Sequence, residues 1–340
     1  MSLILKCEMV LGNIGKRVLF KEVYLLHRYG MIELNMQIST SSTDFLNAFE
    51  EVSHCDLDDH GRKKLNIHIM NTNANEFAYE ALIDNLVEPM IDFAISRVTR
   101  KKLESRPGHL IKKAREEFRR IEENKGELGE LLIYCFLESH LGAPKILTKY
   151  ELKTSPNMYA NGSDGVHYLK LANGNYQLIF SESKMYKAIG AAITDAFESI
   201  NAFKTGLTKE GEFKPGLAYE RGLINGHIDK ETFSAEDARF VERLIYPSKN
   251  EDEDEMIVDD AFAVFIGYEM SITEKEKAKN PTDFRKDLKL KIEKYITKKH
   301  KNIISAIEDN KLTGHDIYIY VVPFTKLSET RTKILKELVR

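Results

Sequence analysis

The chain has 340 residues, of which 42% are hydrophobic and 30% charged, and its formal net charge is −3. This length predicts about two domains, and the composition is typical of a globular protein. Three widely spaced cysteines without a C-x-x-C pair argue against a disulfide framework or a zinc finger, and no apolar run is long enough to span a membrane. The apolar stretch at the start is too interrupted for a signal peptide, so we expect a cytoplasmic protein.

The first 96 residues are expected to form a small α+β lobe. Alternating apolar residues predict two strands before residue 43, a short helix follows at 43–51, and residues 65–70 read as a further strand. The sequence HCDLDDH at 54–60 contains metal-ligand residue types, but its spacing matches no metal motif, so we interpret it as a solvated loop. An amphipathic helix at 76–97, which Pro89 should kink or split, leads out of the lobe.

Residues 97–340 are expected to form the second domain, which opens with a basic stretch. Eleven lysines and arginines lie between residues 97 and 125, on helices at either side of Pro107. Such a surface could approach a nucleic acid, with Lys112 and Lys113 as weak candidates for phosphate contact. A solvated helix face with charge pairs at i,i+4 explains the stretch equally well.

The helix at 126–141 carries two acidic residues within an apolar sequence. Asn124 followed by Glu127 has the form of a capping box, which would give Glu127 a structural role. Glu130 lies one turn deeper among leucines, where a buried carboxylate needs a partner such as a metal ion or a lysine. We therefore favour Glu130 as the functional acid, with Glu127 as the alternative.

The strand around residues 176–186 holds Glu182 and Lys184, which are two residues apart and therefore point to the same face. A carboxylate beside an ammonium group can bind a divalent cation while the lysine orients or activates a water molecule, which suits phosphodiester hydrolysis. Mg²⁺ requires further oxygen ligands. Asp164, at the start of the preceding strand, can supply one.

The hairpin between these strands contains Asn173-Gly174, a strong turn signal. A two-residue turn would place Asp164 opposite Ser183, on the wrong face. A three-residue loop at 173–175 would place it opposite Lys184, so that all the charged groups share one face. We predict the longer loop, or a bulge that corrects the register.

The remainder should complete the sheet and cover it. A small-residue helix is expected at 188–203, a glycine- and lysine-rich loop at 204–226 within an insertion at about 204–258, and a helix at 234–245. Lys187 and Lys204 are weak candidates for phosphate contact, and the acidic run at 250–255 reads as an exposed loop. Apolar segments at 260–268 and 317–323 predict buried central strands, joined by a lysine-rich helix and followed by a last helix at 328–339.

The helix acid, the Asp164 strand and the Glu-x-Lys strand together resemble the PD-(D/E)xK nuclease superfamily, although Ser163 stands where that motif has proline. The stretch ESKMYKAIGAAITDAFESI and the late strand DIYIYVVPF look similar to HamA, the effector family of the Hachiman anti-phage systems. The resemblance implies a restriction-endonuclease-like α/β (α+β) core with a mixed central sheet flanked by helices. It places the family's site on Asp164, Glu182 and Lys184, with Glu130 or Glu127 as the helix acid.

These observations predict a nuclease that uses Mg²⁺ or Mn²⁺. Asp164, Glu182 and the Ser183 carbonyl would hold the metal, Lys184 would position water, and Glu130 would add a ligand or hold Lys184. DNA as substrate, with RNA not excluded, and restraint by a superfamily 2 helicase, HamB, are implied by the resemblance alone. The alternative is an inactive nuclease-fold subunit that binds nucleic acid or a partner protein, with the charged cluster serving as a salt-bridge network.

Overall fold

A computed structural model describes residues 45–119, 126–148, 162–247 and 256–340, and all of these lie within one compact unit, Met36–Arg340. The strands expected before residue 43, Asn124 and the acidic run at 250–255 fall outside the described residues.

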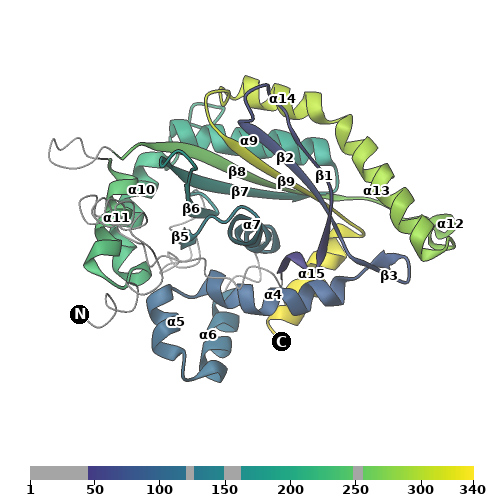
Figure 1. The fold of residues 1–340 in the computed structure, drawn as a ribbon, viewed down its shortest axis with the longest axis horizontal. Helices are drawn as coiled ribbons and strands as arrows, with labels where there is room; N and C mark the ends of the chain where they lie inside the picture. Colours follow the sequence, from purple (N-terminus) through teal and green to yellow (C-terminus); the bar gives the residue numbers. More distant parts are fainter. Residues whose placement is uncertain (1–44, 120–125, 149–161, 248–255) are drawn as a thin grey trace, which may run out of the picture. The chain divides into compact units, whose positions relative to one another are not determined.

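A seven-stranded mixed sheet forms the centre of this unit, in the order β1-β2-β9-β8-β7-β6-β5 (Figure 1). The strands are β1 (Phe49–Asp56), β2 (Lys63–Met70), β5 (Lys145–Thr148), β6 (Gly165–Lys170), β7 (Tyr176–Tyr186), β8 (Val258–Glu269) and β9 (Ile317–Phe324). The four strands β2, β9, β8 and β7 are parallel, whereas β1 and the β6–β5 pair run antiparallel to their neighbours. A separate hairpin joins β3 (Thr72–Asn73) and β4 (Glu76–Phe77). The predicted mixed α+β sheet is thus confirmed, and β1 and β2, from the expected N-terminal lobe, pair within it.

The interior strands are buried on both faces, as their apolar sequences predicted. Every residue of β9 is buried, and so are eight consecutive residues of β8, from Ala261 to Tyr268. Parallel strands of this kind must be covered by helices on both sides, because their side chains alternate between two apolar layers. Removing these side chains from water supplies the main driving force for folding.

One face of the sheet is covered by α7 (Glu127–Ser139), with further helices packed around it. Gly129 lies so close to β7 that a Cβ atom there would be 3.0 Å from Ser183 Oγ and 3.3 Å from Met185 Cγ. This close approach fixes α7 over the odd-numbered side chains of β7. The neighbouring helices of this layer are α4 (Tyr79–Ala94), α6 (Pro107–Arg119) and α15 (Leu327–Leu338).

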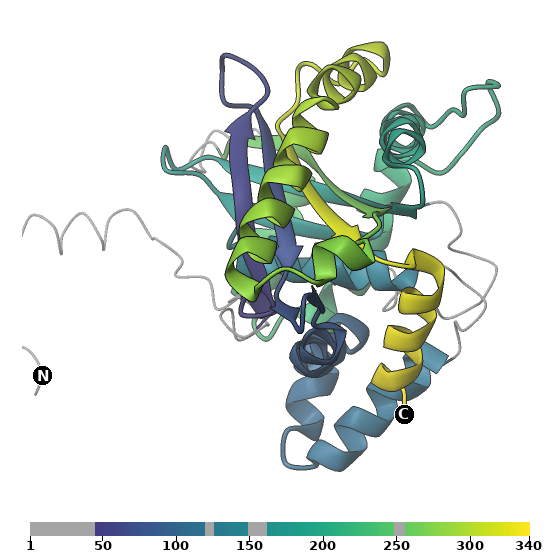
Figure 2. The ribbon, with the colours of Figure 1, turned by 90° about the vertical axis from the view of Figure 1, so that its right-hand side faces the viewer.

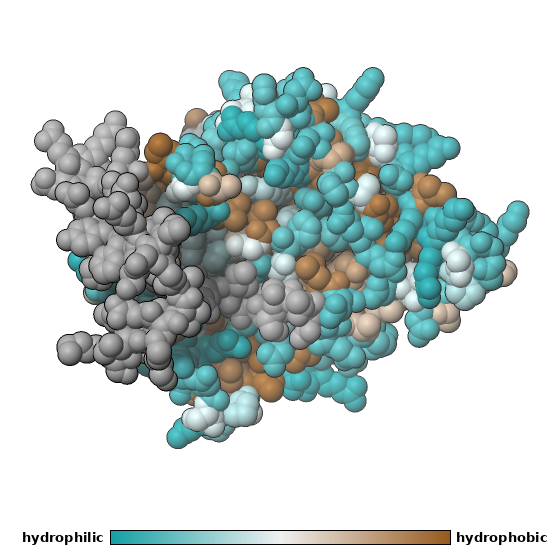
Figure 3. Space-filling model, viewed as in Figure 1, coloured by the Kyte–Doolittle hydropathy of each residue, from teal (hydrophilic) through white to brown (hydrophobic). Residues whose placement is uncertain are grey.

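The other face is covered by α9 (Ile189–Thr205), whose Phe203 ring lies 5.2 Å from that of Phe180 on β7. Figures 1 and 2 show α13 (Pro281–Thr297) and α14 (His300–Asp309) beyond it. Hydrophilic side chains gather over α13 and α14 in Figure 3, and the lysines expected on one helix here are divided between these two and the turn between them. The remaining helices are α5 (Arg97–Leu103), α10 (Leu217–Glu231), α11 (Ala235–Ile245) and α12 (Glu274–Lys277).

Three local predictions were wrong in part. Phe45 and Leu46 are helical, but β1 begins at Phe49 within the helix expected at 43–51, and β1 also takes up residues 54–56 of the segment interpreted as a loop. Pro89 lies inside α4 without dividing it. The loop expected at 204–226 contains most of α10, from Leu217 onward, and the buried positions of this helix include acidic residues and so give no apolar pattern.

Among the described helices, none combines the length and the apolar character that crossing a membrane requires.

Candidate active site on β6, β7 and α7

Glu182 and Lys184 lie on the same face of β7, as their spacing predicted. Lys184 Nζ is 2.8 Å from Glu182 Oε1, and the two side chains are only 21% and 12% exposed. Burial alone would lower the pKa of Lys184, but the charge of Glu182, its hydrogen bond, and the charges of Asp195 and Asp164 together raise it. Lys184 is therefore a cation at neutral pH, suited to holding negative charge rather than to accepting a proton.

Asp164 lies immediately before β6 and is 7% exposed. Its Oδ2 accepts hydrogen bonds from the Ser183 backbone N–H and hydroxyl group, both at 2.8 Å. The charge of Asp164 is among those that raise the pKa of Lys184. The structure thus brings Asp164 close to the Glu-x-Lys strand, through the residue that separates Glu182 from Lys184.

The hairpin loop has the predicted three residues, but the predicted register, with Asp164 opposite Lys184 and on the face of Glu182 and Lys184, is wrong. Leu171 N donates to Asn175 O at 2.8 Å, so the loop comprises residues 172–174, with Gly174 at φ 88°, a value that favours glycine. Gly165 pairs with Ser181, and Asp164 N also donates to Ser181 O at 2.9 Å, so both residues lie opposite Ser181. Asp164 is therefore not opposite Lys184. It reaches Ser183, whose side chain faces α7, while Glu182 and Lys184 face α9.

The first turn of α7 contains both candidate helix acids. Glu127 is 2% exposed and Glu130 7%, so burial does not distinguish them. The described part of the helix begins at Glu127, with Gly126 as its N-cap and no side-chain cap hydrogen bond, and Asn124 of the expected capping box lies outside the described residues. Both carboxylates lie at the positive end of the helix dipole. Either acid could therefore serve the site.

The predicted acids do not form a closed cluster. Among the described residues, the only three ligand groups whose atoms all lie within 4.8 Å of one another are Glu51, His68 and His140, at the other end of α7. Asp164, Glu182 and Glu130 therefore do not converge to that distance in this structure.

Two acidic residues near the site were missed by the sequence analysis. Asp195 of α9 lies with Oδ2 3.5 Å from Lys184 Nζ. Glu220 of α10 is 2% exposed and accepts a 2.7 Å hydrogen bond from Ser163 Oγ, directly beside Asp164. A Cβ at Gly162 would lie 2.7 Å from Glu220 Oε2, so a side chain there would displace the Glu220 carboxylate. No local sequence pattern marks Glu220, because its partner Ser163 is far away along the chain.

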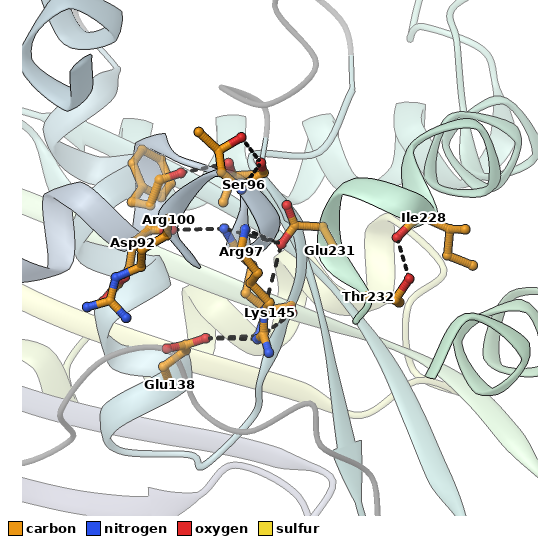
Figure 4. A network of polar contacts seen from close by, with 12 residues as sticks. Asp92, Ser96, Arg97, Arg100, Glu138, Lys145, Ile228, Glu231 and Thr232 are labelled. Carbon is orange, nitrogen blue, oxygen red and sulfur yellow. Dashed lines mark hydrogen bonds and ion pairs between the residues drawn. The ribbon is translucent and has the colours of Figure 1, made fainter. Parts of the chain in front are cut away.

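A buried network of charges holds α10 against the rest of the structure (Figure 4). Glu231 of α10 lies 3.7 Å from both Arg97 Nε and Lys145 Nζ, while Glu138 of α7 accepts from Lys145 N at 2.9 Å. Lys145 is 0% exposed and donates to Asp92 O at 2.8 Å. Buried charges of this kind are tolerated only when they are paired and hydrogen-bonded. The network joins α4, α5, α7, β5 and α10.

The four lysines suggested as phosphate contacts have ordinary surroundings. Lys112 and Lys113 lie 3.9 and 3.8 Å from Glu116 and Glu117, as in the solvated-face interpretation. Lys204 Nζ donates to the Lys311 carbonyl at 2.7 Å. Lys187 follows the end of β7 and is exposed.

A mixed sheet with helices on both faces places the protein in the α+β class, and a carboxylate–lysine pair on an interior strand is consistent with a nuclease-like core. More specifically, the HamA family model matches residues 43–338, so the chain belongs to the HamA family. This membership makes it a component of the Hachiman type of anti-phage defence. No curated protein matches the chain.

Proposed function

We propose that the chain is a metal-dependent nuclease, the effector of a Hachiman defence system. The observation that carries the proposal is the half-buried cation of Lys184, held between Glu182 and Asp195, with Asp164 fixed on the intervening Ser183. The HamA family match supports a role in defence.

The donor types suit Mg²⁺ or Mn²⁺. Asp164 and Glu182 offer carboxylate oxygens, which hard divalent cations prefer, and the Ser183 carbonyl is the third expected ligand. Because Asp164 is hydrogen-bonded to Ser183 on the α7 side while Glu182 faces α9, one of the two carboxylates must turn for both to bind the same ion. Two carboxylates against one lysine leave a negative charge that a divalent cation would offset. When bound, the ion would neutralise charge on a phosphodiester and promote ionisation of water.

The side chains have distinct roles in this proposal. Lys184, protonated and close to Glu182, holds negative charge that develops on the phosphate. Ser183 orients Asp164 through two hydrogen bonds, and Glu130 or Glu127 adds an acid from α7. Because Lys184 is held as a cation, it positions water or phosphate instead of removing a proton.

The decisive experiment is incubation of the purified chain with duplex DNA, single-stranded DNA and RNA, with Mg²⁺ or with EDTA. We expect Lys184→Ala to lower cleavage by about 10²–10³-fold, the usual effect of removing one transition-state donor. Lys209→Ala is the matched control, because Lys209 is exposed and pairs with Glu198. Cleavage that survives both EDTA and Lys184→Ala would falsify the mechanism. Binding without cleavage by the wild type would instead support the inactive-subunit alternative.

Metal binding has a second readout that does not depend on turnover. Because an ion that binds only the folded state stabilises it, Mg²⁺ should raise the free energy of unfolding by about 2.7 kcal/mol at 100 times its Kd. Glu182→Gln should abolish this gain. An unchanged melting temperature at Mg²⁺ concentrations that support cleavage would contradict the proposed ligands.

We also propose that a superfamily 2 helicase, HamB, restrains the nuclease until it engages foreign or damaged DNA. The support is family membership, together with the absence of an evident base-reading motif in the sequence. Co-expression should give a stable complex with suppressed cleavage, and the free wild-type chain should be toxic while Lys184→Ala is not. A chain that neither binds this helicase nor harms cells would remove this part of the proposal.

A further inference from the structure

A second group of ligand-type side chains lies where β1, β2 and the end of α7 meet. Glu51 on β1 pairs directly across the sheet with His68 on β2, and His140 is the C-cap residue of α7. One ligand atom from each lies within 4.8 Å of the others. These residues come from three elements, so only the fold brings them together.

A bulge in β1 arranges the acidic side of this group. Glu51 pairs with His68 but Ser53 pairs with Ile67, so Val52 is an extra residue in β1. In a regular strand, residues 51 and 54 would point to opposite faces. The bulge turns both toward the face of His68, and His54 Nδ1 hydrogen-bonds Glu51 Oε1 there. Bulges commonly redirect side chains at functional sites.

His68 itself gives an independent indication of a ligand. It is 3% exposed, and its Nδ1 is buried without a hydrogen-bond partner among the described residues. An unsatisfied buried polar nitrogen is costly, and a bound ion would relieve that cost. The ring is held in place by Phe136, 4.9 Å away, and by His140, 5.2 Å away.

His140 is oriented in the way that metal-binding histidines usually are. Its Nδ1 lies 3.1 Å from Tyr320 Oη, which leaves the other ring nitrogen as a ligand atom.

We propose that Glu51, His68 and His140 bind a divalent transition-metal ion, for which Zn²⁺ is the best match. Two imidazoles and one carboxylate are a common set of three protein ligands for Zn²⁺, whereas Mg²⁺ prefers oxygen ligands alone. Tetrahedral Zn²⁺ ligands lie about 3.4 Å apart, given bond lengths of about 2.1 Å. The ligand atoms must therefore draw together from separations of up to 4.8 Å, and exposed Glu51 can move to do so.

This site is separate from the proposed nuclease site. Glu127 and Glu130 lie at the first turn of α7 and His140 at its end, and 13 helical residues span about 20 Å. In the sheet, β9 and β8 lie between β2 and β7. The bound ion would fasten the edge strand β1 to the end of α7, on the same side of the sheet.

The test is Zn²⁺ binding to the full-length, EDTA-stripped protein, followed by calorimetry and by metal analysis after dialysis. Glu51→Gln and His140→Gln alter exposed side chains and should leave the fold intact, which circular dichroism can check. We expect each to lose one equivalent of Zn²⁺, or to weaken its Kd by at least about tenfold to a hundredfold. His109→Gln, an exposed histidine on α6, should bind like the wild type.

Asp164→Asn distinguishes this site from the proposed nuclease site and should leave the Zn²⁺ equivalent in place. Zn²⁺ should also raise the melting temperature of the wild type but not that of the Glu51 and His140 variants. Loss of Zn²⁺ in Asp164→Asn with retention in Glu51→Gln and His140→Gln would overturn the proposal. So would a wild type that binds no Zn²⁺ at micromolar concentrations. Neither result would bear on Mg²⁺-dependent cleavage.

Discussion

His167 on β6 should make the folded protein sensitive to acid. It is 0% exposed, and neither ring nitrogen has a hydrogen-bond partner among the described residues. Burial, with Lys145 and Arg97 adding to it, lowers its pKa from 6.5 to about 3. The folded state therefore keeps His167 neutral at a pH where the unfolded chain takes up a proton.

The sign and size of the effect follow from this difference. Above pH 6.5 neither state is protonated, so His167 costs nothing. As the pH falls below 6.5, the unfolded state gains protons and the free energy of unfolding decreases. At pH 5 the unfolded pKa is 1.5 units above the solution pH, which corresponds to a loss of about 2 kcal/mol.

The assay is urea denaturation of wild type and His167→Leu at pH 7.5 and pH 5.0. Leucine cannot be protonated, so the stability of the variant relative to the wild type should rise by about 2 kcal/mol at the lower pH. The quantity to compare is the difference in unfolding free energy between variant and wild type at each pH, because the stability contributed by other buried groups also changes with pH. His109→Leu, at an exposed position, should show no such change. A relative change below about 0.5 kcal/mol would refute the burial of a neutral His167, since linkage requires the larger value.

Three further changes test other parts of the structure. Burial raises the pKa of Asp92 from 3.8 to about 7, although Arg100 and Lys145 act to lower it. Between pH 3.8 and 7 the unfolded chain therefore loses this proton before the folded state does, and the free energy of unfolding decreases as the pH rises. Asp92→Asn should therefore gain stability relative to the wild type, by roughly 2 kcal/mol between pH 5 and 7.5 in the same denaturation assay. Gly129→Ala places a Cβ 3.0 Å from Ser183 Oγ. We expect a loss of about 1–3 kcal/mol of stability, measured by thermal melting, together with reduced cleavage. Wild-type stability in this variant would mean that α7 can move away from β7. Glu220→Gln keeps the shape of the side chain but removes the negative charge of the group that accepts the hydrogen bond from Ser163. We expect the variant to lose about 1.5–3 kcal/mol of stability and to cleave more weakly. Unchanged stability and cleavage would show that α10 does not support Asp164.

The features that could be predicted from the sequence depend on local periodicity. Glu182 and Lys184 share a face because strands alternate, and Asn173-Gly174 marked the hairpin that brings Asp164 to Ser183, the residue between them. The central strands were recognisable because both of their faces are apolar. These properties need no knowledge of the rest of the fold.

The features that could not be predicted depend on partners distant in sequence. Glu220 has a role only because Ser163, 57 residues away, is placed against it. The His68 group depends on an unpredicted bulge at Val52 and on the point where α7 ends at His140. Glu127 and Glu130 remain indistinguishable for a different reason, because both are buried in the same helical turn.

The way in which α10 is attached has a consequence for the dynamics of the chain. Its buried residues are Glu220, Ile224 and Glu231, so polar contacts hold it and little apolar surface would be exposed if it detached. The buried residues of α9, in contrast, are all apolar. Segments with few apolar contacts open locally at low free energy, so the amides of α10 should exchange with solvent hydrogen before those of α9. Each such opening would uncover Ser163 beside Asp164, giving the site a transient entrance on the side of α10.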